Sequence, residues 1–573
     1  MYMRRSRDDS SPRVAAAVVA VTAAALLARL WALGWRVAHQ DEARVADWTL
    51  QYMDLGAWQY RPIIHGPFLP HVNGVVFDVF GATDFTMRLV VAVVGGLLPL
   101  TAWLYRTRLS DVEVGALAVL LAANPVVLYY SRFMRNDLLL AGFMFTAVGL
   151  FVRFLDTHRA RYLYASAVPF ALAFTTKENS LLYPLCWLGA LALVTDDRMA
   201  VAGATDTSRL AVVRRAAARI RHRAWRAKAA LAGSALTAAV IVVSFYAPKP
   251  DLYRLFEQPG RAPAVLEAAT IGTYHEFADL WASTSTVAHS YVAFLSHDLS
   301  VLVACGTVVS VAAVVGYLAN RYATETPRPL VSFAFYWGVF SVLGYPAVVD
   351  IAAAWTAVNA LVPLAIPAAV GVGAVVRYGR RGAAAGDTAA VRLAVTVLVV
   401  SAAGMGAVAA ETTYAHPQSP SNPLVQYAQP GGTMQPTIDD IQRAATATSG
   451  LDVLYYGDSN DTADDGLEFS DAGDGTFNVT TGPPSGWHDR LPFPWYLSQV
   501  GANATTVQTA AEVPDTPPPV VISVVSEEDD FAALLAAADN SQYERHTYPR
   551  YLTDGHNTLV IYVDTTAVPA AQQ

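Results

Sequence analysis

The chain has 573 residues, of which 54% are hydrophobic and 15% are charged, and its formal net charge is −8. Soluble domains carry about 25% charged residues, so this composition excludes an ordinary soluble enzyme. The apolar content excludes a disordered acidic protein, and the absence of a strongly basic balance excludes a nucleic-acid partner.

The charge is divided unevenly along the chain. Residues 1–410 hold 35 basic and 25 acidic side chains (net +10), whereas residues 411–573 hold 4 basic and 22 acidic side chains (net −18). We therefore expect two parts in different surroundings, a membrane part over 1–410 and an acidic domain over 411–573.

Apolar segments that approach or reach the roughly 20 residues of a bilayer span recur through the first part. The first follows several arginines, as a signal peptide would, but its length and the spans after it favour a retained helix. We expect eleven spans, at about 14–34, 89–105, 112–130, 138–152, 162–176, 180–195, 229–247, 299–319, 329–346, 351–376 and 390–410. The fold class predicted is a polytopic α-helical membrane protein.

Lys and Arg collect on the cytoplasmic side of membrane proteins. With the N-terminus inside, the inner segments of 1–410 hold 24 basic residues and the outer loops hold 10. This orientation puts 411–573 outside the plasma membrane. The N-x-[ST] sequons agree with it, since all three (Asn460, Asn478 and Asn503) lie in this last segment.

Two outer loops, 35–88 and 248–298, are long enough to be structured, and residues 411–573 predict a small α/β domain. We expect helices over 437–449, capped by Gly450, and over 529–539. Strands are expected over 451–456, 520–525 and 558–563. The Gly/Asp/Pro-rich stretch 457–518 predicts a loop.

Asp41 and Glu42 follow the first span directly, at the outer surface of the membrane. One interpretation is a solvated loop end. The other is a carboxylate held at the interface by the aromatic, amphipathic segment that follows, where it could deprotonate a hydroxyl while its reaction partner stays in lipid.

Three cations lie at other outer turns. Arg132 and Arg135, with Asp137, lie between the third and fourth spans, where snorkelling arginines are the simpler interpretation. Lys177 and Glu178 lie in a very short turn between the fifth and sixth spans; they could pair with each other, or Lys177 could serve a ligand. Together, one base and a cluster of cations suit displacement of a lipid phosphate from a sugar.

These residues carry a family resemblance. The order D-E after the first span, H-G-P (His65–Pro67), D-x-x-x-R (Asp84 to Arg88), S-R-x-x-R-x-D and T-K-E resembles the GT-C membrane glycosyltransferases. The set is similar to the protein O-mannosyltransferases and the lipid A aminoarabinose transferases. With P-W-Y-L (Pro494–Leu497), the whole chain resembles archaeal flippase-activity-associated proteins of N-glycosylation.

The resemblance implies that Asp41 is the catalytic base, with Glu42 beside it. It also implies that Arg132, Arg135 and Lys177 meet the polyisoprenyl phosphate. The remaining candidates are Asp137 and Glu178 beside the donor, and His65, Arg88, Trp495 and Tyr496 near the acceptor or in supporting loops. The H-G-P sequence replaces the H-P-P of the mannosyltransferases and leaves the acceptor open.

The histidines show no ligand spacing, so no cofactor is predicted; a divalent cation held by Asp41 with His65 or His71 stays an alternative. The leading hypothesis is a glycosyltransferase that uses a polyisoprenyl-phosphate-linked sugar and a glycan or protein acceptor in the lipid bilayer. The alternative is a non-catalytic flippase-associated protein that binds lipid-linked sugars beside other N-glycosylation components. A secondary transporter is disfavoured, because matching broken helices are missing from the two halves.

Overall fold

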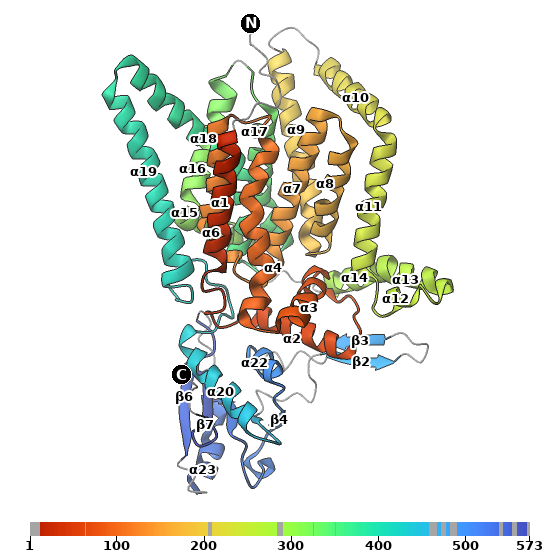
Figure 1. Ribbon diagram of the computed structural model, residues 1–573, viewed down its shortest axis with the longest axis vertical. Coiled ribbons are helices and arrows are strands. Elements are labelled where there is room, and N and C mark those ends of the chain that lie inside the picture. Colours follow the sequence, from red (N-terminus) through yellow and green to blue (C-terminus); the bar gives the residue numbers. More distant parts are fainter. Residues whose placement is uncertain are drawn as a thin grey trace.

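The computed structural model describes residues 12–62, 65–203, 209–283, 290–324, 326–349, 351–457, 467–471, 477–481, 490–537, 542–552 and 558–569. The chain forms an elongated molecule with a long helical bundle and a smaller domain at one end of it (Figure 1). We call this end of the bundle the domain end. The first helix, the short helices after it and the last domain therefore meet in one region.

The bundle is built from apolar helices that run between its two ends (Figure 1). They are α1 (Pro12–Leu30), α4 (Asp84–Leu97) continued by η2 (Leu98–Tyr105), α5 (Asp111–Ala123), α6 (Pro125–Tyr130), α7 (Asn136–Thr157), α8 (Ala160–Phe174), α9 (Leu182–Gly203), α11 (Lys228–Tyr246), α15 (Tyr291–Cys305), α16 (Thr307–Tyr322), α17 (Pro329–Val348), α18 (Val358–Ala385) and α19 (Thr388–Ala410). A basic helix, α10 (Arg209–Arg226), joins α9 to α11 at the end far from the domain.

A multi-pass membrane fold is confirmed, but the count of eleven spans is not. Seven helices of the described part are long and apolar enough to cross a membrane, or eight if one bent pair forms a single span. The expected span 112–130 is divided into α5 and α6 because Pro125 follows Asn124, and proline cannot continue a helical hydrogen-bond ladder. The expected span 162–176 corresponds to α8, whose 15 residues are fewer than the roughly 20 that cross a bilayer.

The expected continuous span 299–319 is wrong, because α15 and α16 meet at an angle of 94°. The break falls at Gly306, which ends α15 in a non-helical conformation. A β-carbon at this position would lie 3.0 Å from the Leu361 side chain, so the glycine lets the bend pack against α18.

Two glycines fix the tight packing of α16 against α18. A β-carbon at Gly316 would lie 1.8 Å from the Pro367 carbonyl oxygen, and one at Gly371 would lie 2.2 Å from that of Ala312. Small residues at helix contacts allow this approach in membranes. Gly371 therefore serves packing, in agreement with its position inside an apolar segment.

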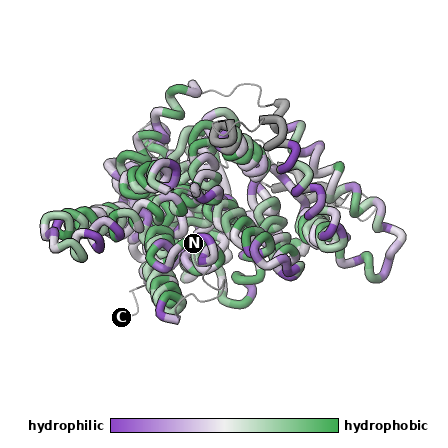
Figure 2. Tube along the Cα trace, turned by 90° about the horizontal axis from the view of Figure 1, so that it is seen from above, coloured by the Kyte–Doolittle hydropathy of each residue, from purple (hydrophilic) through white to green (hydrophobic). Residues whose placement is uncertain are grey.

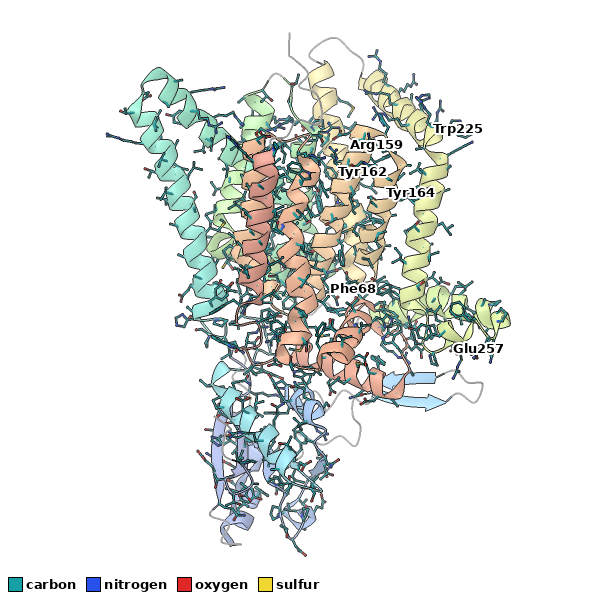
Figure 3. All side chains as sticks on the ribbon, viewed as in Figure 1. Phe68, Arg159, Tyr162, Tyr164, Trp225 and Glu257 are labelled. Atoms are coloured by element: carbon teal, nitrogen blue, oxygen red, sulfur yellow. The ribbon has the colours of Figure 1, made fainter. Side chains whose placement is uncertain are left out.

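Apolar side chains also cover the outside of the bundle, as a lipid-facing surface requires. Leu393 and Val400 on α19 are 56% and 63% exposed. Seen along the long axis of the molecule, much of the bundle's Cα trace is made of hydrophobic residues (Figure 2). Side chains such as Arg159, Tyr162 and Trp225 lie toward the end of the bundle far from the domain, whereas Phe68 lies toward the domain end (Figure 3).

Short helices cover the domain end. The segment after α1 forms α2 (Gln40–Leu55) and α3 (Phe68–Phe80), and the segment after α11 forms α12 (Asp251–Arg254), α13 (Ala262–Glu267) and α14 (Thr273–Ser283). They lie across the ends of the bundle helices (Figure 1). This arrangement puts α2 between the bundle and the last domain.

The last domain has a five-stranded sheet in the order β4-β1-β5-β7-β6. Strand β1 is parallel to β4 and β5, and β7 is antiparallel to β5 and β6, with Ile522 opposite Ile561. The elements are α20 (Gln435–Ala447), β1 (Val453–Tyr456), β2 (Leu467–Asp471), β3 (Phe477–Thr481), α22 (Phe493–Val500), β4 (Ala504–Val507), β5 (Val520–Val524), α23 (Asp529–Ala537), β6 (Tyr543–Pro549) and β7 (Thr558–Asp564).

Alternate residues of the central strands point to opposite faces. Val453 and Ile522 belong to the core that includes α20 and α22, whereas Leu454 and Val521 pack with Phe531 of α23. The predicted α/β domain is confirmed, with α20 ending at Ala447 and capped by Thr448 instead of Gly450. The predicted loop 457–518 is wrong, because it contains β2, β3, α22 and β4. Phe493, Trp495 and Leu497 bury an apolar helix face within it.

Candidate functional site

The site begins at the start of α2, where the backbone is held by a reciprocal cap. The His39 Nδ1 accepts a hydrogen bond from the Asp41 backbone N–H at 3.0 Å, and the Glu42 carboxylate accepts one from the His39 N–H at 3.1 Å. Such a cap fixes the first turn of a helix. Because successive residues are about 100° apart around the axis, Asp41 and Glu42 face different surroundings.

Glu42 lies in a fully buried charge cluster, which we call the Glu42 cluster (Arg36, Glu42 and Arg88). Its carboxylate accepts from Arg36 Nη2 at 3.1 Å, from Arg88 Nε at 3.0 Å and from the Met134 backbone N–H at 2.7 Å. Burial raises the pKa of Glu42, but the charges of Arg88 and Arg36 lower it by more than burial raises it, so that the pKa is about 2. The carboxylate therefore joins the start of α2 to α4 and to the turn before α7.

Asp41 faces a second cluster, which we call the Asp41 cluster (Asp41, Arg44, Arg135 and Tyr427). Arg135 Nη1 lies 2.6 Å from Asp41 Oδ2, and Arg44 Nη2 lies 3.3 Å from Oδ1. The side chain is 18% exposed, in contrast to the fully buried Glu42. Burial raises the pKa of Asp41, but the charge of Arg135 lowers it more, so that the pKa lies well below its usual range.

Tyr427 covers Asp41 from the segment between α19 and α20. Its hydroxyl donates to Asp41 Oδ2 at 3.3 Å, and its backbone carbonyl accepts from His39 Nε2 at 2.6 Å. Burial lowers the pKa of His39, so the imidazole is neutral at pH 7, with its proton on Nε2. This contact links the beginning of the chain to the segment that leads into the last domain.

Lys177 and Arg135 meet beside Asp41. Lys177 Nζ lies 3.2 Å from Asp137 Oδ1, and Arg135 Nε lies 3.5 Å from Asp137 Oδ2. The ring of Trp355 lies against both cations, 3.9 Å from the Arg135 guanidinium carbon and 6.0 Å from Lys177 Nζ. Two cations thus converge where they could hold an anion such as a phosphate.

A small cavity of about 20 Å³ opens among these groups. Its lining includes Asp41, His65, Arg135 and Asp137. A cavity of this size holds about one water molecule. A sugar phosphate can therefore enter only after side chains of the Asp41 cluster move apart.

Two sequence motifs meet at the edge of this cavity. The Gly66 N–H donates to the Thr176 carbonyl at 3.0 Å, and a β-carbon at Gly66 would lie 2.3 Å from the Thr175 carbonyl oxygen. The H-G-P turn can therefore approach the T-K-E turn only with glycine in its middle. Here His65 Nδ1 lies 3.0 Å from Glu178 Oε2, so Glu178 pairs with His65 while Lys177 pairs with Asp137.

Three candidates lie apart from the Asp41 cluster. Arg132 donates to four backbone carbonyls at the end of α1, including that of Arg29 at 2.8 Å. Trp495 Nε1 and the Tyr496 hydroxyl both donate to Asp84, at 2.7 and 3.1 Å. These aromatic residues attach α22 of the last domain to the start of α4.

Three residues of the two clusters were missed from the sequence, Arg36, Arg44 and Tyr427, and so was Trp355, which lies against Arg135. Arg44 had a usable signal, because it is three residues after Asp41 on a predicted helix and so lies on the same face. Trp355 and Tyr427 had none, since they lie more than 300 positions from Asp41. Within the described ranges, His, Cys, Asp and Glu side chains form no group of three that could hold a metal. His71 contacts Lys249 Nζ at 3.0 Å instead of Asp41.

Two families match parts of the chain. Residues 64–206 match the family described as dolichyl-phosphate-mannose-protein mannosyltransferase, and residues 434–564 match the Agl23 flippase-associated protein C-terminal domain. The first match includes His65, Arg135 and Lys177, and the second covers the last domain from α20 to β7. A search of curated proteins found no match.

Solved structures share the architecture over almost the whole chain. ArnT from Cupriavidus metallidurans in the apo state is 14% identical, with a TM-score of 0.56, over 97% of this chain and 99% of its own. The same protein bound to undecaprenyl phosphate gives 15% identity and the same score and coverage. The archaeal oligosaccharyltransferase AglB from Archaeoglobus fulgidus gives 13% identity and 0.49 over 96% and 74%. At such identity the likeness to ArnT shows the fold.

Proposed function

We propose, from the premise that this chain is a GT-C superfamily member related to the Agl23 flippase-associated proteins, that it is a glycosyltransferase. It transfers a sugar from a polyisoprenyl-phosphate donor to a glycan or protein acceptor at the outer face of the plasma membrane. The observation that carries this proposal is that Asp41 and Arg135 meet at one cavity, with Lys177 bound to Asp137 of its lining, at the end of the bundle opposite the basic helix α10.

The geometry supports a single displacement. Asp41 accepts the proton of an acceptor hydroxyl, the acceptor oxygen bonds to the anomeric carbon, and the bond from that carbon to the phosphate oxygen breaks. The electron pair leaves with the phosphate, whose charge Arg135 and Lys177 neutralise. One base suffices, because a phosphate needs little help to depart, and the product has inverted configuration.

Arg135 connects donor binding to the basicity of Asp41. In the structure Arg135 pairs with Asp41 and holds its pKa low, so the carboxylate is a weak base. A donor phosphate that attracts Arg135 away removes this charge and raises the pKa of Asp41. The same movement widens the small cavity, so that the base gains strength only when the donor is present.

The matched families support a polyisoprenyl donor. The region that matches the dolichyl-phosphate-mannose-protein mannosyltransferase family supplies both cations, and the ArnT of similar fold is described bound to undecaprenyl phosphate. We propose the orientation from charge: α10 is basic and lies far from the Asp41 cluster, which puts α10 in the cytoplasm and the cluster outside.

The test is the Asp41→Asn variant in purified full-length protein. We expect wild type to consume a polyisoprenyl-phosphate sugar from a lipid extract of its own membrane and the variant to lose roughly 10²–10⁴-fold in rate. Asp111→Asn, an exposed acid in the first turn of α5, is the matched control and should retain the activity. Full transfer by Asp41→Asn would refute the assignment.

The second candidate is a non-catalytic protein that binds lipid-linked sugars in flipping. The match of residues 434–564 to a flippase-associated domain favours it. A reconstituted-liposome assay separates the two functions. Movement of lipid-linked sugar across the bilayer without an acceptor, and unchanged in Asp41→Asn, would support the flippase-associated function and reject the transferase.

A further inference from the structure

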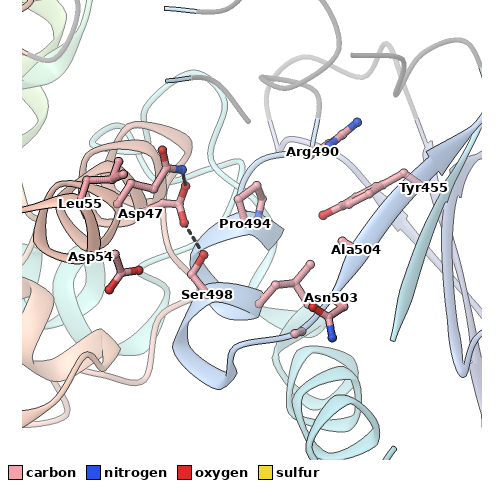
Figure 4. A pocket seen from close by; sticks show the side chains of 12 residues that line it. Asp47, Asp54, Leu55, Tyr455, Arg490, Pro494, Ser498, Asn503 and Ala504 are labelled. Carbon is pink, nitrogen blue, oxygen red and sulfur yellow. Dashed lines mark hydrogen bonds between the residues drawn. The ribbon is translucent and has the colours of Figure 1, made fainter. Parts of the chain in front are cut away.

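A second, much larger cavity lies between α2 and the last domain (Figure 4). Its volume is about 520 Å³, against about 20 Å³ for the cavity beside Asp41. Its polar lining includes Asp47, Gln51, Asp54, Tyr455, Arg490 and Asn503. A volume of this order falls within the range of ligand sites in proteins.

One wall of the cavity is a polar face of α2. Asp47, Gln51 and Asp54 are spaced four and three residues apart, so they lie on one face of the helix. The other wall comes from the last domain and presents Tyr455, Arg490 and Asn503 (Figure 4). The cavity is thus faced by carboxylates, which accept hydrogen bonds, and by amide and guanidinium groups, which donate them.

The walls are held in place by a contact that crosses the domain boundary and by contacts within each wall. Asp47 is buried and accepts hydrogen bonds from Ser498 Oγ at 2.6 Å and from Gln51 Nε2 at 2.9 Å. Arg490 is also buried, with its guanidinium carbon 4.7 Å from the centre of the Tyr455 ring. A site that is ordered before binding loses less entropy when the ligand arrives.

The chemistry of the lining selects the class of ligand. Sugar hydroxyls are neutral donors and acceptors, so they fit a space with both signs of partner, and apolar patches such as Leu55 and Pro494 suit sugar C–H faces. A lipid tail would remove solvent from the exposed polar groups of Asp54 and Asn503, which is costly. A nucleic acid is disfavoured, because the two carboxylates on one wall would repel its phosphates.

The cavity and the base lie along the same helix. Asp47 and Asp54 follow Asp41 by 6 and 13 residues, which at about 1.5 Å per residue places them roughly 9 and 20 Å further along α2. At about 100° per residue, Asp47 and Asp54 also lie more than 100° around the helix axis from Asp41. A saccharide chain with its terminal hydroxyl at Asp41 would therefore curve around α2 to reach the cavity.

We propose that this cavity binds the body of an oligosaccharide acceptor, distal to the sugar whose hydroxyl reacts at Asp41. The proposal rests on the proposed transferase function and specifies its acceptor as a glycan chain. The cavity requires both α2 and the last domain, which gives the domain a direct part in acceptor selection.

The test measures binding and needs no turnover. Soluble mannose and glucose oligosaccharides are titrated into full-length protein in detergent by saturation-transfer NMR. We expect the oligosaccharide that wild type binds to be bound at least tenfold more weakly by two variants. One is Ala504→Trp, which fills the cavity from an exposed strand position, and the other is the double variant Gln51→Ala with Asp54→Ala. Thr446→Trp, on an exposed face of α20, is the matched control and should bind as wild type.

The outcomes separate this inference from the proposed function. Asp41→Asn should lose transfer but retain oligosaccharide binding through the cavity, because its carboxylate meets only the terminal hydroxyl and does not line this cavity. Binding lost in the cavity variants would support the inference even if no transfer is ever detected. Equal binding in wild type and Ala504→Trp, or binding of a glycopeptide but of no free oligosaccharide, would overturn it while leaving transfer at Asp41 untouched.

Discussion

The Glu42 cluster and the Asp41 cluster start from adjacent residues of one helix but differ in burial and in access to a cavity. Glu42 is fully buried between two arginines and a backbone N–H, whereas Asp41 is 18% exposed and borders a cavity. Both carboxylates have a lowered pKa because of arginine charges. The difference lies in access, since only Asp41 can exchange its protein partners for a ligand.

This contrast distinguishes a charge cluster that stabilises the fold from one that can bind a ligand. A buried charge with all its partners in the protein is costly to disturb and offers nothing to a substrate. A charge at a cavity can change partners, and Arg135 offers Asp41 such an exchange. We therefore propose that Glu42 positions α2 and that Asp41 takes part in the proposed reaction.

The largest expected effect is on folding and tests the Glu42 cluster. Glu42→Ala leaves Arg36 and Arg88 buried without their carboxylate, and breaking such a pair costs about 3–5 kcal/mol. We expect a low yield of folded protein and a markedly lower Tm by scanning fluorimetry in detergent. Asp111→Asn controls for loss of an acid at a helix start. A wild-type Tm in Glu42→Ala would reject the structural assignment.

The next effect tests the exchange at the Asp41 cluster. Arg135→Ala removes both the partner of Asp41 and a phosphate-binding cation, so we expect transfer to fall about 10²–10³-fold while the protein folds. Arg135→Lys keeps the charge but loses the forked geometry and should recover only part of the rate. Transfer rates and thermal unfolding are measured together, and equal rates in wild type and Arg135→Ala would remove Arg135 from the mechanism.

A pH titration compares the two proteins that differ only in the charge of residue 42. The folded-state pKa of Glu42 is about 2 and its ordinary value is 4.5. Its ionised form therefore stabilises the fold above pH 4.5, and this contribution is lost as the pH falls toward 2. We expect wild type to lose more stability than Glu42→Gln across this window, as read from Tm against pH; parallel curves would contradict the prediction.

The smallest effect concerns Tyr427. Tyr427→Phe removes a hydroxyl that donates to Asp41 at 3.3 Å and keeps the ring, so the cost is about 0.5–1.5 kcal/mol. Losing a donor to the carboxylate also raises the pKa of Asp41. We expect the acid limb of the transfer pH profile to move to higher pH in Tyr427→Phe, a shift that a purely structural role would not produce.

The sequence predicted the membrane architecture, the last domain and the approach of Lys177 to Arg135 from charge order and short motifs. The residues alone could not separate Asp41 from Glu42, because their surroundings depend on which side of α2 meets a cavity; only the family resemblance named Asp41 as the base. Arg132 has the spacing of a ligand-binding residue but turns back to the end of α1. Trp355 and Tyr427 reach the site only through tertiary folding, which local patterns do not encode.

The hydrogen bond from Tyr427 to Asp41 joins residues separated by 386 positions. During synthesis, Asp41 emerges from the ribosome long before the segment that covers it, and the last domain follows later still. A partly made chain therefore holds an uncovered carboxylate and no wall opposite α2. The site can therefore form only after the segment around Tyr427 and the last domain have been synthesised.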